Sequence, residues 1–439
     1  MVKFTSLAGL AALTASTVLA QHKPGEKIII NAPGQPNLDD GVSDTGEKEP
    51  FNPRRYRKRK VQCFAWDRST DPWTENLLDI TWVDLNPEAK RTLLFVHGWP
   101  GLWSTWANQI EEFREDYHLL VPDLRGFGWS SHPGDPEDSG TIPDHVDDLV
   151  CLLEAAKVKH AVCVGHDWGA QICWQAARQR PDLFEAVAGA AVPYLPAHGD
   201  FVPTDHLVPY FPKLAYQLYF AKKTKEAYAE LEKDIRKTLR AVFRTSKTVP
   251  PAKFLTSTEN FLDAYEEGSL DERIPFFNKF EEDYLVKVYG VQGFKNSLSF
   301  YTHGGRYRSW EFAHNQGNHT IPQPALFIQP SKDSVADWGK VSALAGSAKF
   351  IPQLETVVLE TSHWPQLERP AEFNAALRTW LGKLPPVGSV DYSMTAREEA
   401  EGADEEAAHR HGTSGGSKLA EGKIVDLDEK IREKAHEEL

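Results

Sequence analysis

Five residues, Gly165-His166-Asp167-Trp168-Gly169, constrain this chain more than any other segment. Their spacing is that of a nucleophile elbow, a sharp turn between a strand and a helix that holds a reactive side chain in a strained backbone conformation. Such a turn leaves no room for large side chains two positions before and two after the nucleophile. Gly165 and Gly169 meet that requirement. The position usually taken by serine holds Asp167.

An aspartate at this position changes the chemistry that the turn can support. A carboxylate is ionised at neutral pH, because its reference pKa is about 4. After attack on a saturated carbon it leaves an ester, which water can hydrolyse, whereas a serine that opened a three-membered ring would leave an ether. Asp is also a favoured N-cap, so the elbow alone does not separate a nucleophile from the cap of the following helix.

Length and composition indicate a soluble globular protein with room for a large core, since 439 residues are 41% hydrophobic and 26% charged. The net charge is -14, and half of it comes from residues 391–439, which hold 14 acidic residues and 7 Lys or Arg. No nucleic-acid partner is expected, because the only dense basic run is at residues 54–60. We interpret that run as a solvated entry to a strand; a dibasic processing site is the alternative.

The two ends of the chain suggest the secretory pathway. Residues 1–20 have the pattern of a signal peptide, with Lys3 before a mostly apolar stretch, and residues 21–52 read as a loose leader. No later stretch reaches the roughly 18 apolar residues of a membrane span, so none is expected in the mature chain. The chain ends His436-Glu437-Glu438-Leu439, close to the His-Asp-Glu-Leu signal that ER retention receptors bind. Retention in the ER lumen and secretion both stay open.

An oxidising compartment would permit disulfides, but the settings of the four cysteines do not suggest a framework. They lie in apolar strand or helix patterns, and we expect buried free thiols at Cys63, Cys151, Cys163 and Cys173. One glycosylation sequence, Asn318-His319-Thr320, could be used if it is exposed.

Apolar strands and helical patterns alternate along most of the chain, which predicts a mostly parallel α/β sheet with helices on both faces. Strands are expected at 77–85, 92–96, 118–121, 161–164, 186–192, 325–328 and 356–359, and helices at 105–113, 144–156, 168–178 and 371–381. The alternation stops at residues 195–318, which are aromatic-rich and mainly helical. We therefore predict a core at 53–194 and 319–386, an inserted helical cap at 195–318, and an acidic, largely disordered tail at 387–439.

Seven separated motifs, in this order, closely resemble the epoxide hydrolases of the α/β-hydrolase superfamily over residues 56–384. They are His-Gly-Trp-Pro at 97–100, Asp-Leu-Arg-Gly-Phe-Gly-Trp-Ser at 123–130, the elbow, Tyr-Gln-Leu-Tyr-Phe at 216–220, Ser-Phe-Tyr at 299–301, Lys-Asp at 332–333 and Ser-His-Trp at 362–364. The resemblance implies an α/β-hydrolase fold and an enzyme that adds water to an oxirane to give a vicinal diol. The implied partner is a small-molecule epoxide, no cofactor or metal is implied, and no motif specifies an oligomeric state.

The catalytic residues of an α/β-hydrolase occur along the chain in the order nucleophile, acid, histidine, and the candidates in this sequence have the same order. His363 follows a strand and is the candidate base for the water that attacks the ester; His97 and His166 are its rivals by residue type. Asp333 is the candidate acid that orients His363, preferred to Asp337 and Glu360, which lie further from the expected turn.

The resemblance matches Tyr216 and Tyr301 to the paired cap tyrosines that protonate the opened oxirane, with Tyr219 and Tyr307 as neighbours to confuse with them. Without the resemblance, aromatic residues at helical spacing would be interpreted as part of the hydrophobic core. Trp99 and Trp168 are expected to donate backbone N–H groups to an oxyanion hole, while their indoles line the pocket. The resemblance also suggests a cis bond before Pro100.

Two other functions compete with this interpretation. A haloalkane dehalogenase shares the fold and the aspartate nucleophile, but that family typically has asparagine at the position of Trp99 and lacks the tyrosine pair. A catalytically silent binding protein of this fold would typically have lost the nucleophile, base or acid, and all three are present here.

Overall fold

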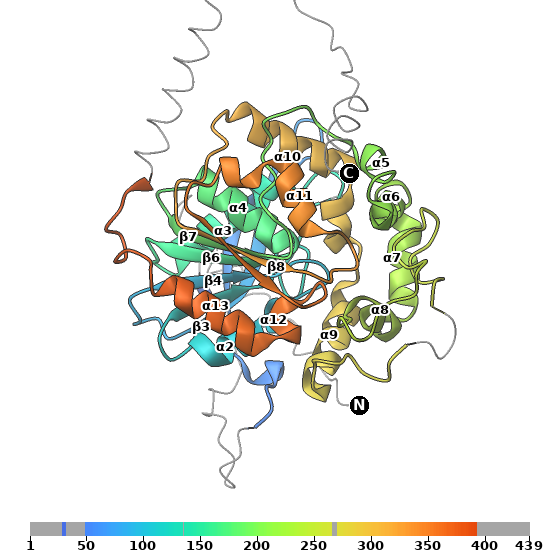
Figure 1. The fold of residues 1–439 in the computed structure, drawn as a ribbon, viewed down its shortest axis with the longest axis horizontal. Helices are drawn as coiled ribbons and strands as arrows, with labels where there is room; N and C mark the ends of the chain where they lie inside the picture. The colour runs from blue at the N-terminus through green and yellow to red at the C-terminus, as the bar shows by residue number, and fades with distance from the viewer. Residues whose placement is uncertain (1–28, 32–48, 135, 266–269, 393–439) are drawn as a thin grey trace, which may run out of the picture. The chain divides into compact units, whose positions relative to one another are not determined.

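A nine-stranded sheet forms the centre of the described part of the protein (Figure 1). The structure, a computed structural model, describes residues 29–31, 49–134, 136–265 and 270–392. The strand order is β1-β2-β3-β5-β4-β6-β7-β8-β9; strands β4 to β9 run parallel, and β1, β2 and β3 are antiparallel to their neighbours. The strands are β1 Ile29–Asn31, β2 Lys58–Asp67, β3 Thr74–Leu85, β4 Thr92–Val96, β5 His118–Pro122, β6 Ala161–His166, β7 Phe184–Ala190, β8 Ala325–Pro330 and β9 Leu354–Leu359.

Helices cover both faces of this sheet, as the alternating pattern predicts (Figure 1). One face carries α3 (Ile142–Ala155) and α4 (Trp168–Gln179), and the other carries α2 (Ala107–Phe113), α12 (Pro365–Glu368) and α13 (Pro370–Leu381). Every residue of β4, β5 and β6 is buried, which explains why these strands are uninterrupted apolar runs.

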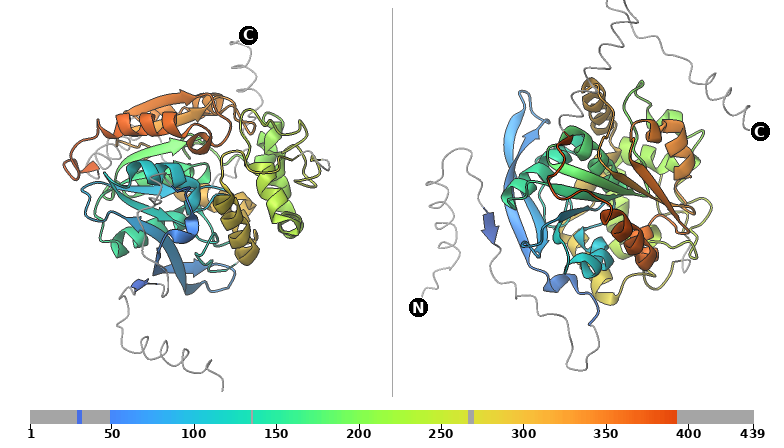
Figure 2. Two further views of the ribbon diagram at one scale, coloured as in Figure 1. Left: turned by 90° about the horizontal axis from the view of Figure 1, so that it is seen from below. Right: turned by 60° about the vertical axis from the view of Figure 1, so that its left-hand side comes forward.

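The segment between β7 and β8 contains no strand in its described residues. Its helices are α5 Thr204–Leu207, α6 Ala215–Lys222, α7 Thr224–Lys233, α8 Ile235–Val242, α9 Lys279–Gln292 and α10 His303–Asn315, with 3-10 turns η3 at Pro212–Leu214 and η4 at Asn296–Tyr301. Together they form the cap, which lies beside the sheet (Figure 2). Its aromatic rings pack on Trp99, directly after β4, so the cap covers the carboxyl ends of the parallel strands. Among the described residues no helix is long and apolar enough to cross a membrane.

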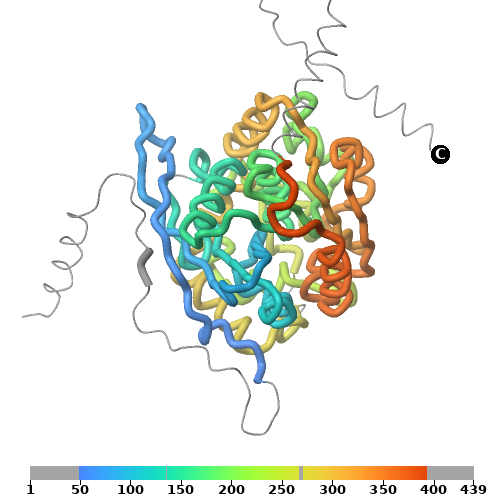
Figure 3. The backbone as a smooth tube through the Cα atoms, turned by 90° about the vertical axis from the view of Figure 1, so that its left-hand side faces the viewer, coloured from blue at the N-terminus to red at the C-terminus, as the bar shows by residue number. Residues whose placement is uncertain are grey.

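The expected loose leader contains a strand. Residues Ile29–Asn31 form β1, which pairs antiparallel with β2, with Ile29 opposite Val61 and Asn31 opposite Arg59. The β2–β3 hairpin runs along one side of the core (Figure 3), and β1 adds to its open edge. The isoleucines at residues 28–30 favour a strand, but the surrounding Pro, Gly and Asp concealed that preference.

The basic run at residues 54–60 is not wholly a solvated entry to the strand. Arg54, Arg55 and Arg57 are exposed, but Lys58 opens β2. Its ammonium lies 4.9 Å from the centre of the Trp103 ring and 5.0 Å from that of Tyr284. Burial lowers the pKa of Lys58 to about 8, although the charge of Asp123 opposes the shift.

The expectation of free thiols is wrong. Cys63 of β2 is bonded to Cys151 of α3, and Cys163 of β6 is bonded to Cys173 of α4, with Cα atoms 6.0 and 5.4 Å apart. Each cysteine does lie in a strand or helix, but the fold packs α3 against β2 and folds α4 back onto β6. The predicted signal segment at residues 1–20 and the final four residues lie outside the described residues.

Loss of the Cys63–Cys151 bond should destabilise the protein more than loss of Cys163–Cys173. The sequence separations are 88 and 10 residues. Loop-closure entropy assigns roughly 4–5 kcal/mol to the longer loop and roughly 3 kcal/mol to the shorter one. Denaturant unfolding of the paired alanine variants would measure both, and equal stability of either variant and the wild type would contradict the corresponding bond.

Candidate active site

The turn at Asp167 connects β6 to α4 with φ 56° and ψ -122°, a backbone conformation that non-glycine residues rarely adopt. A Cβ atom added to Gly165 would lie 2.2 Å from the Gly169 carbonyl oxygen. One added to Gly169 would lie 2.2 Å from the carbonyl oxygen of Val96 in β4. Both positions therefore require glycine, and the turn is packed directly against the neighbouring strand.

The Asp167 carboxylate makes no capping hydrogen bond, although Asp167 occupies the N-cap position of α4. Its Oδ1 instead accepts the backbone N–H of Trp99 at 2.9 Å, and the carboxylate also accepts the N–H of Trp168. A Cβ on Gly98 would lie 2.4 Å from Oδ1, so the loop after β4 can approach this closely only with glycine there. These two donors are where an oxyanion hole would need them.

His363 lies between two carboxylates. Its Nδ1 is 2.7 Å from Asp333 Oδ2, and its Nε2 is 3.4 Å from Asp167 Oδ2. Asp333 follows β8, and His363 follows β9. Because β6, β8 and β9 are parallel, their carboxyl ends bring the three residues to one edge of the sheet.

Two hydrogen-bond donors orient the Asp333 carboxylate toward His363. Its Oδ2 accepts the indole N–H of Trp338 at 2.6 Å, and Oδ1 accepts the backbone N–H of Val335 at 2.8 Å. The rival acids are used elsewhere. Asp337 caps α11 (Trp338–Ala345), and Glu360 pairs with Lys332.

The two rival histidines hold the loops around the site. His97 Nδ1 bonds the Gly98 carbonyl at 2.9 Å, and its Nε2 accepts the N–H of Leu124 at 3.1 Å. His166 Nε2 donates to the His363 carbonyl at 2.7 Å. Burial lowers the pKa of His166 to about 3, so this imidazole is neutral and acts through its hydrogen bond.

The charges of the triad stabilise one another. Burial alone would lower the pKa of His363, but the carboxylates of Asp333 and Asp167 outweigh it and raise the pKa to about 10. Burial alone would raise the pKa of Asp167, but the hydrogen bond and charge of His363 lower it. At neutral pH the site therefore holds an ionised Asp167 carboxylate beside an imidazolium.

Tyr216 of α6 and Tyr301 at the end of η4 lie together on the cap side of this site. Their rings are 5.7 Å apart, and their hydroxyls are hydrogen bonded to each other. The Tyr301 ring stands edge-on to Trp99 and Trp168, at 5.7 and 5.5 Å. Burial and the charge of Asp167 raise the pKa of Tyr216, so the phenol keeps its proton until a strong base forms beside it.

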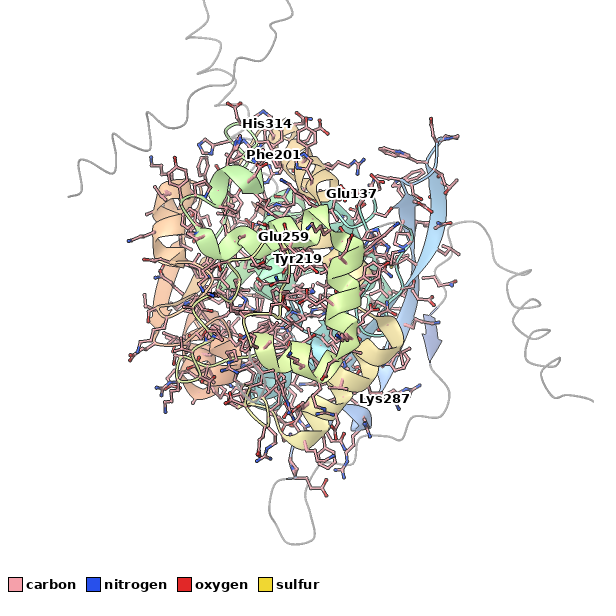
Figure 4. The ribbon with its side chains drawn as sticks, turned by 90° about the vertical axis from the view of Figure 1, so that its right-hand side faces the viewer. Glu137, Phe201, Tyr219, Glu259, Lys287 and His314 are labelled. Carbon is pink, nitrogen blue, oxygen red and sulfur yellow. A yellow bond between two sulfur atoms is a disulfide. The ribbon has the colours of Figure 1, made fainter. Side chains whose placement is uncertain are left out.

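The neighbouring tyrosines point elsewhere. Tyr219 is on the same helix as Tyr216, but its hydroxyl bonds Glu230, and Figure 4 labels it among the cap helices. Tyr307 is 39% exposed and donates to Glu311 at 3.2 Å.

The two tryptophans contribute more than backbone donors. The Trp168 side chain donates to the Tyr301 hydroxyl, and the Trp99 indole N–H donates to Ser297 Oγ at 3.2 Å. The bond between Trp99 and Pro100 is cis, as the resemblance suggests. The Pro100 carbonyl accepts the hydroxyl of Tyr289 at 3.0 Å, so cap residues hold the oxyanion loop.

Several residues of the site carry no signal that sequence reasoning could have used. Ser297 and Arg306 act through hydrogen bonds to residues far away in the sequence, and Trp338 and Gln217 through hydrogen bonds to nearby residues that depend on how their side chains are turned. No group of three or more His, Cys, Asp or Glu within the described ranges is arranged to hold a metal ion.

Comparison with known proteins gives consistent matches. Residues 91–370 match the family model of the alpha/beta hydrolase fold. The chain is 31% identical over 325 residues to epoxide hydrolase A of Mycobacterium tuberculosis, covering 71% of this chain and 98% of that protein. It is 29% identical over 290 residues to bifunctional epoxide hydrolase 2 of Rattus norvegicus, covering 65% of this chain but only 50% of the rat protein.

A solved structure extends the similarity to the fold. The crystal structure of epoxide hydrolase A from Mycobacterium thermoresistibile has a TM-score of 0.60 and 28% sequence identity, and covers 74% of this chain and 99% of that one.

Replacing Asp333 by asparagine should lower the pKa of His363 from about 10 toward the ordinary value near 6.5, because it removes the largest influence that raises it. An NMR titration of the imidazole would measure the shift. Asp337→Asn is the matched control, since Asp337 caps α11 and should leave the titration unchanged. An Asp333→Asn protein that titrates like the wild type would contradict the arrangement.

Proposed function

Because the chain belongs to the epoxide hydrolases of the α/β-hydrolase fold, we propose that it adds water to an oxirane and releases a vicinal diol through an ester on Asp167. The observation that carries the proposal is the bonded pair Tyr216 and Tyr301, of which Tyr301 packs on the two tryptophans whose N–H groups hold Asp167. A pair of phenols beside a carboxylate nucleophile suits a leaving oxygen that needs a proton.

Ring opening uses both sides of the site. With Oδ1 of Asp167 held by the backbone donors, Oδ2 attacks a ring carbon, and the carbon–oxygen bond of the oxirane breaks. The oxygen stays attached as an alkoxide, a strong base, and takes a proton from the phenol pair. The products of this step are the ester and a tyrosinate.

Ester hydrolysis depends on His363 losing its proton. While Asp167 is ionised it helps to raise the pKa of His363, and ester formation removes that charge. The pKa of His363 then falls, and its proton can pass to the tyrosinate, leaving a neutral imidazole that can act as a base. His363 takes a proton from the water that attacks the carbonyl carbon, and the N–H groups of Trp99 and Trp168 hold the negative charge that forms on Oδ1. The bond from that carbon to Oδ2 then breaks, and the departing diol oxygen takes a proton from the new hydroxyl on Asp167, so that an ionised Asp167 again lies beside a protonated His363.

The haloalkane dehalogenase alternative is not favoured. A departing halide needs no proton, so a dehalogenase would not use the tyrosine pair. Position 99, where that family typically has asparagine, holds a tryptophan whose indole N–H is bonded to Ser297. A silent binding protein is also not favoured, because Asp167, His363 and Asp333 are all present and His363 contacts both carboxylates.

The walls of the site support a small apolar epoxide as substrate. Aromatic rings of the cap surround the Trp99 indole, with Phe220, Phe261 and Tyr301 at 5.4, 5.9 and 5.7 Å. The scheme uses no cofactor or metal.

A single turnover in water enriched in heavy oxygen should give an unlabelled diol, because its new oxygen comes from Asp167, while the enzyme keeps the label. A labelled diol would argue for direct attack by water. Incubation with 1-chloroalkanes is the control, and halide release without diol formation from epoxides would overturn the assignment.

Replacing His363 by glutamine should make the ester accumulate, because its hydrolysis should slow by about 10²–10⁴-fold. The mass of the intact protein should show the adduct.

We further propose that the protein enters the secretory pathway, and the two disulfides support this, because such bonds persist in oxidising compartments. Glycosylation of Asn318 stays a prediction; that residue is half-buried, and its Oδ1 accepts the N–H of Thr320 at 2.9 Å.

Expressed with its first 20 residues in a eukaryotic host, the protein should have a mature N-terminus at Gln21, which N-terminal sequencing would show. An intact N-terminus would contradict cleavage. A secreted reporter carrying the final four residues would separate ER retention from secretion, since only a retained reporter supports binding to the retention receptor.

A further inference from the structure

A hydrogen-bonded chain leads away from the tyrosine pair to a cation. Arg306 of α10 donates from Nη1 to Gln217 Oε1 at 2.7 Å, and Gln217 Nε2 donates to the Tyr216 hydroxyl oxygen at 3.3 Å. A guanidinium can only donate, so it fixes the Gln217 carbonyl on its own side and turns the amide NH2 toward Tyr216. The phenol oxygen therefore accepts a hydrogen bond, and its proton is left to point into the site.

The charge of Arg306 has no carboxylate partner within the described ranges of the chain. Its guanidinium carbon lies 5.9 Å from the centre of the Trp168 ring, which stacks on Phe300 at 5.1 Å. Burial lowers the pKa of Arg306, and the groups that raise it are the phenols of Tyr216 and Tyr301. A guanidinium remains charged despite such a shift, so an unpaired positive charge lies behind the two phenols.

We propose that Arg306 is a positioning residue for ring opening, which acts through Gln217 to orient the Tyr216 hydroxyl and to stabilise the phenolate that forms when Tyr216 protonates the alkoxide. The inference rests on the proposed epoxide hydrolase function. Negative charge on the Tyr216 oxygen strengthens the bond from Gln217, because hydrogen bonds to charged groups are stronger than those between neutral ones. Gln217 in turn is polarised by the guanidinium, in surroundings where electrostatic interactions are weakly screened.

The alternative is that Arg306 and Gln217 merely tie α6 to α10. A tie of that kind would affect stability and both chemical steps together. The chain offers a matched comparison in Arg308, also on α10, which pairs with Asp138 and donates to the backbone carbonyl of Glu137, a core residue labelled in Figure 4. These contacts join α10 to the core and involve neither Gln217 nor the two phenols.

The test separates the two chemical steps in the full-length enzyme. Arg306→Met should slow ester formation about 10- to 100-fold in rapid-quench mass measurements, the loss expected for a hydrogen-bonded charge. It should leave hydrolysis of the preformed ester within about 3-fold of the wild type. Arg308→Met should leave both steps unchanged, and Arg306→Lys should recover part of the rate because it retains the charge.

A double-mutant cycle shows whether the effect passes through Tyr216. In a Tyr216→Phe protein, adding Arg306→Met should slow ester formation by less than about 3-fold, since there is no phenolate at that position to stabilise. Equal effects in both backgrounds, or equal slowing of both steps, would overturn the inference. If Arg306→Met does not fold, Gln217→Leu removes the same link and should give the same pattern, and wild-type rates in that variant would also overturn it.

The inference and the proposed function fail in different ways. If the wild type forms no ester from any epoxide, the proposed function falls and takes the inference with it. If the wild type forms the ester and Arg306→Met does so at the same rate, only the role of Arg306 is wrong.

Discussion

The turn at Asp167 depends on three stretches of backbone that pass one another at contact distance. Gly165 and Gly169 meet across the turn, and Gly169 meets Val96 of β4. This contact holds α4 over the junction of β4 and β6 and imposes the unusual φ and ψ of Asp167. The side chain is thereby raised above the carboxyl edge of the sheet, where the loops after β4, β8 and β9 can reach it.

Around that turn, the core and the cap contribute different charged and polar groups to the site. The core places one imidazole between two carboxylates, so that the charge on Asp167 and the charge on His363 are mutually dependent. The cap supplies the phenols of Tyr216 and Tyr301 and, through Gln217, the cation of Arg306. In the proposed reaction, an ester on Asp167 would therefore lower the pKa of His363 on one side, while the oxygen of the opened oxirane would meet the two phenols on the other.

Local patterns predicted much of this fold because each depends on neighbours in the sequence. The strand expected at 92–96 has the same bounds as β4, and the helix expected at 168–178 ends one residue before α4 does. The strand β1 and both disulfides were missed, since each depends on a partner in another element. Ile29–Asn31 is a strand because β2 offers it a free edge, and Cys63 is paired because α3 packs beside it.

The sequence by itself determined the fold class and the residues that could act. An aspartate in a glycine-flanked elbow, a later acid and histidine, and an aromatic insertion predict a carboxylate nucleophile on an α/β sheet beneath a cap. Only the tertiary structure decided which tyrosines face Asp167, that Ser297 accepts the Trp99 indole N–H and that Arg306 lies behind Tyr216. The physical reason is that hydrogen bonds and burial act through space, between residues separated by long stretches of chain, and leave no periodic or local pattern to read.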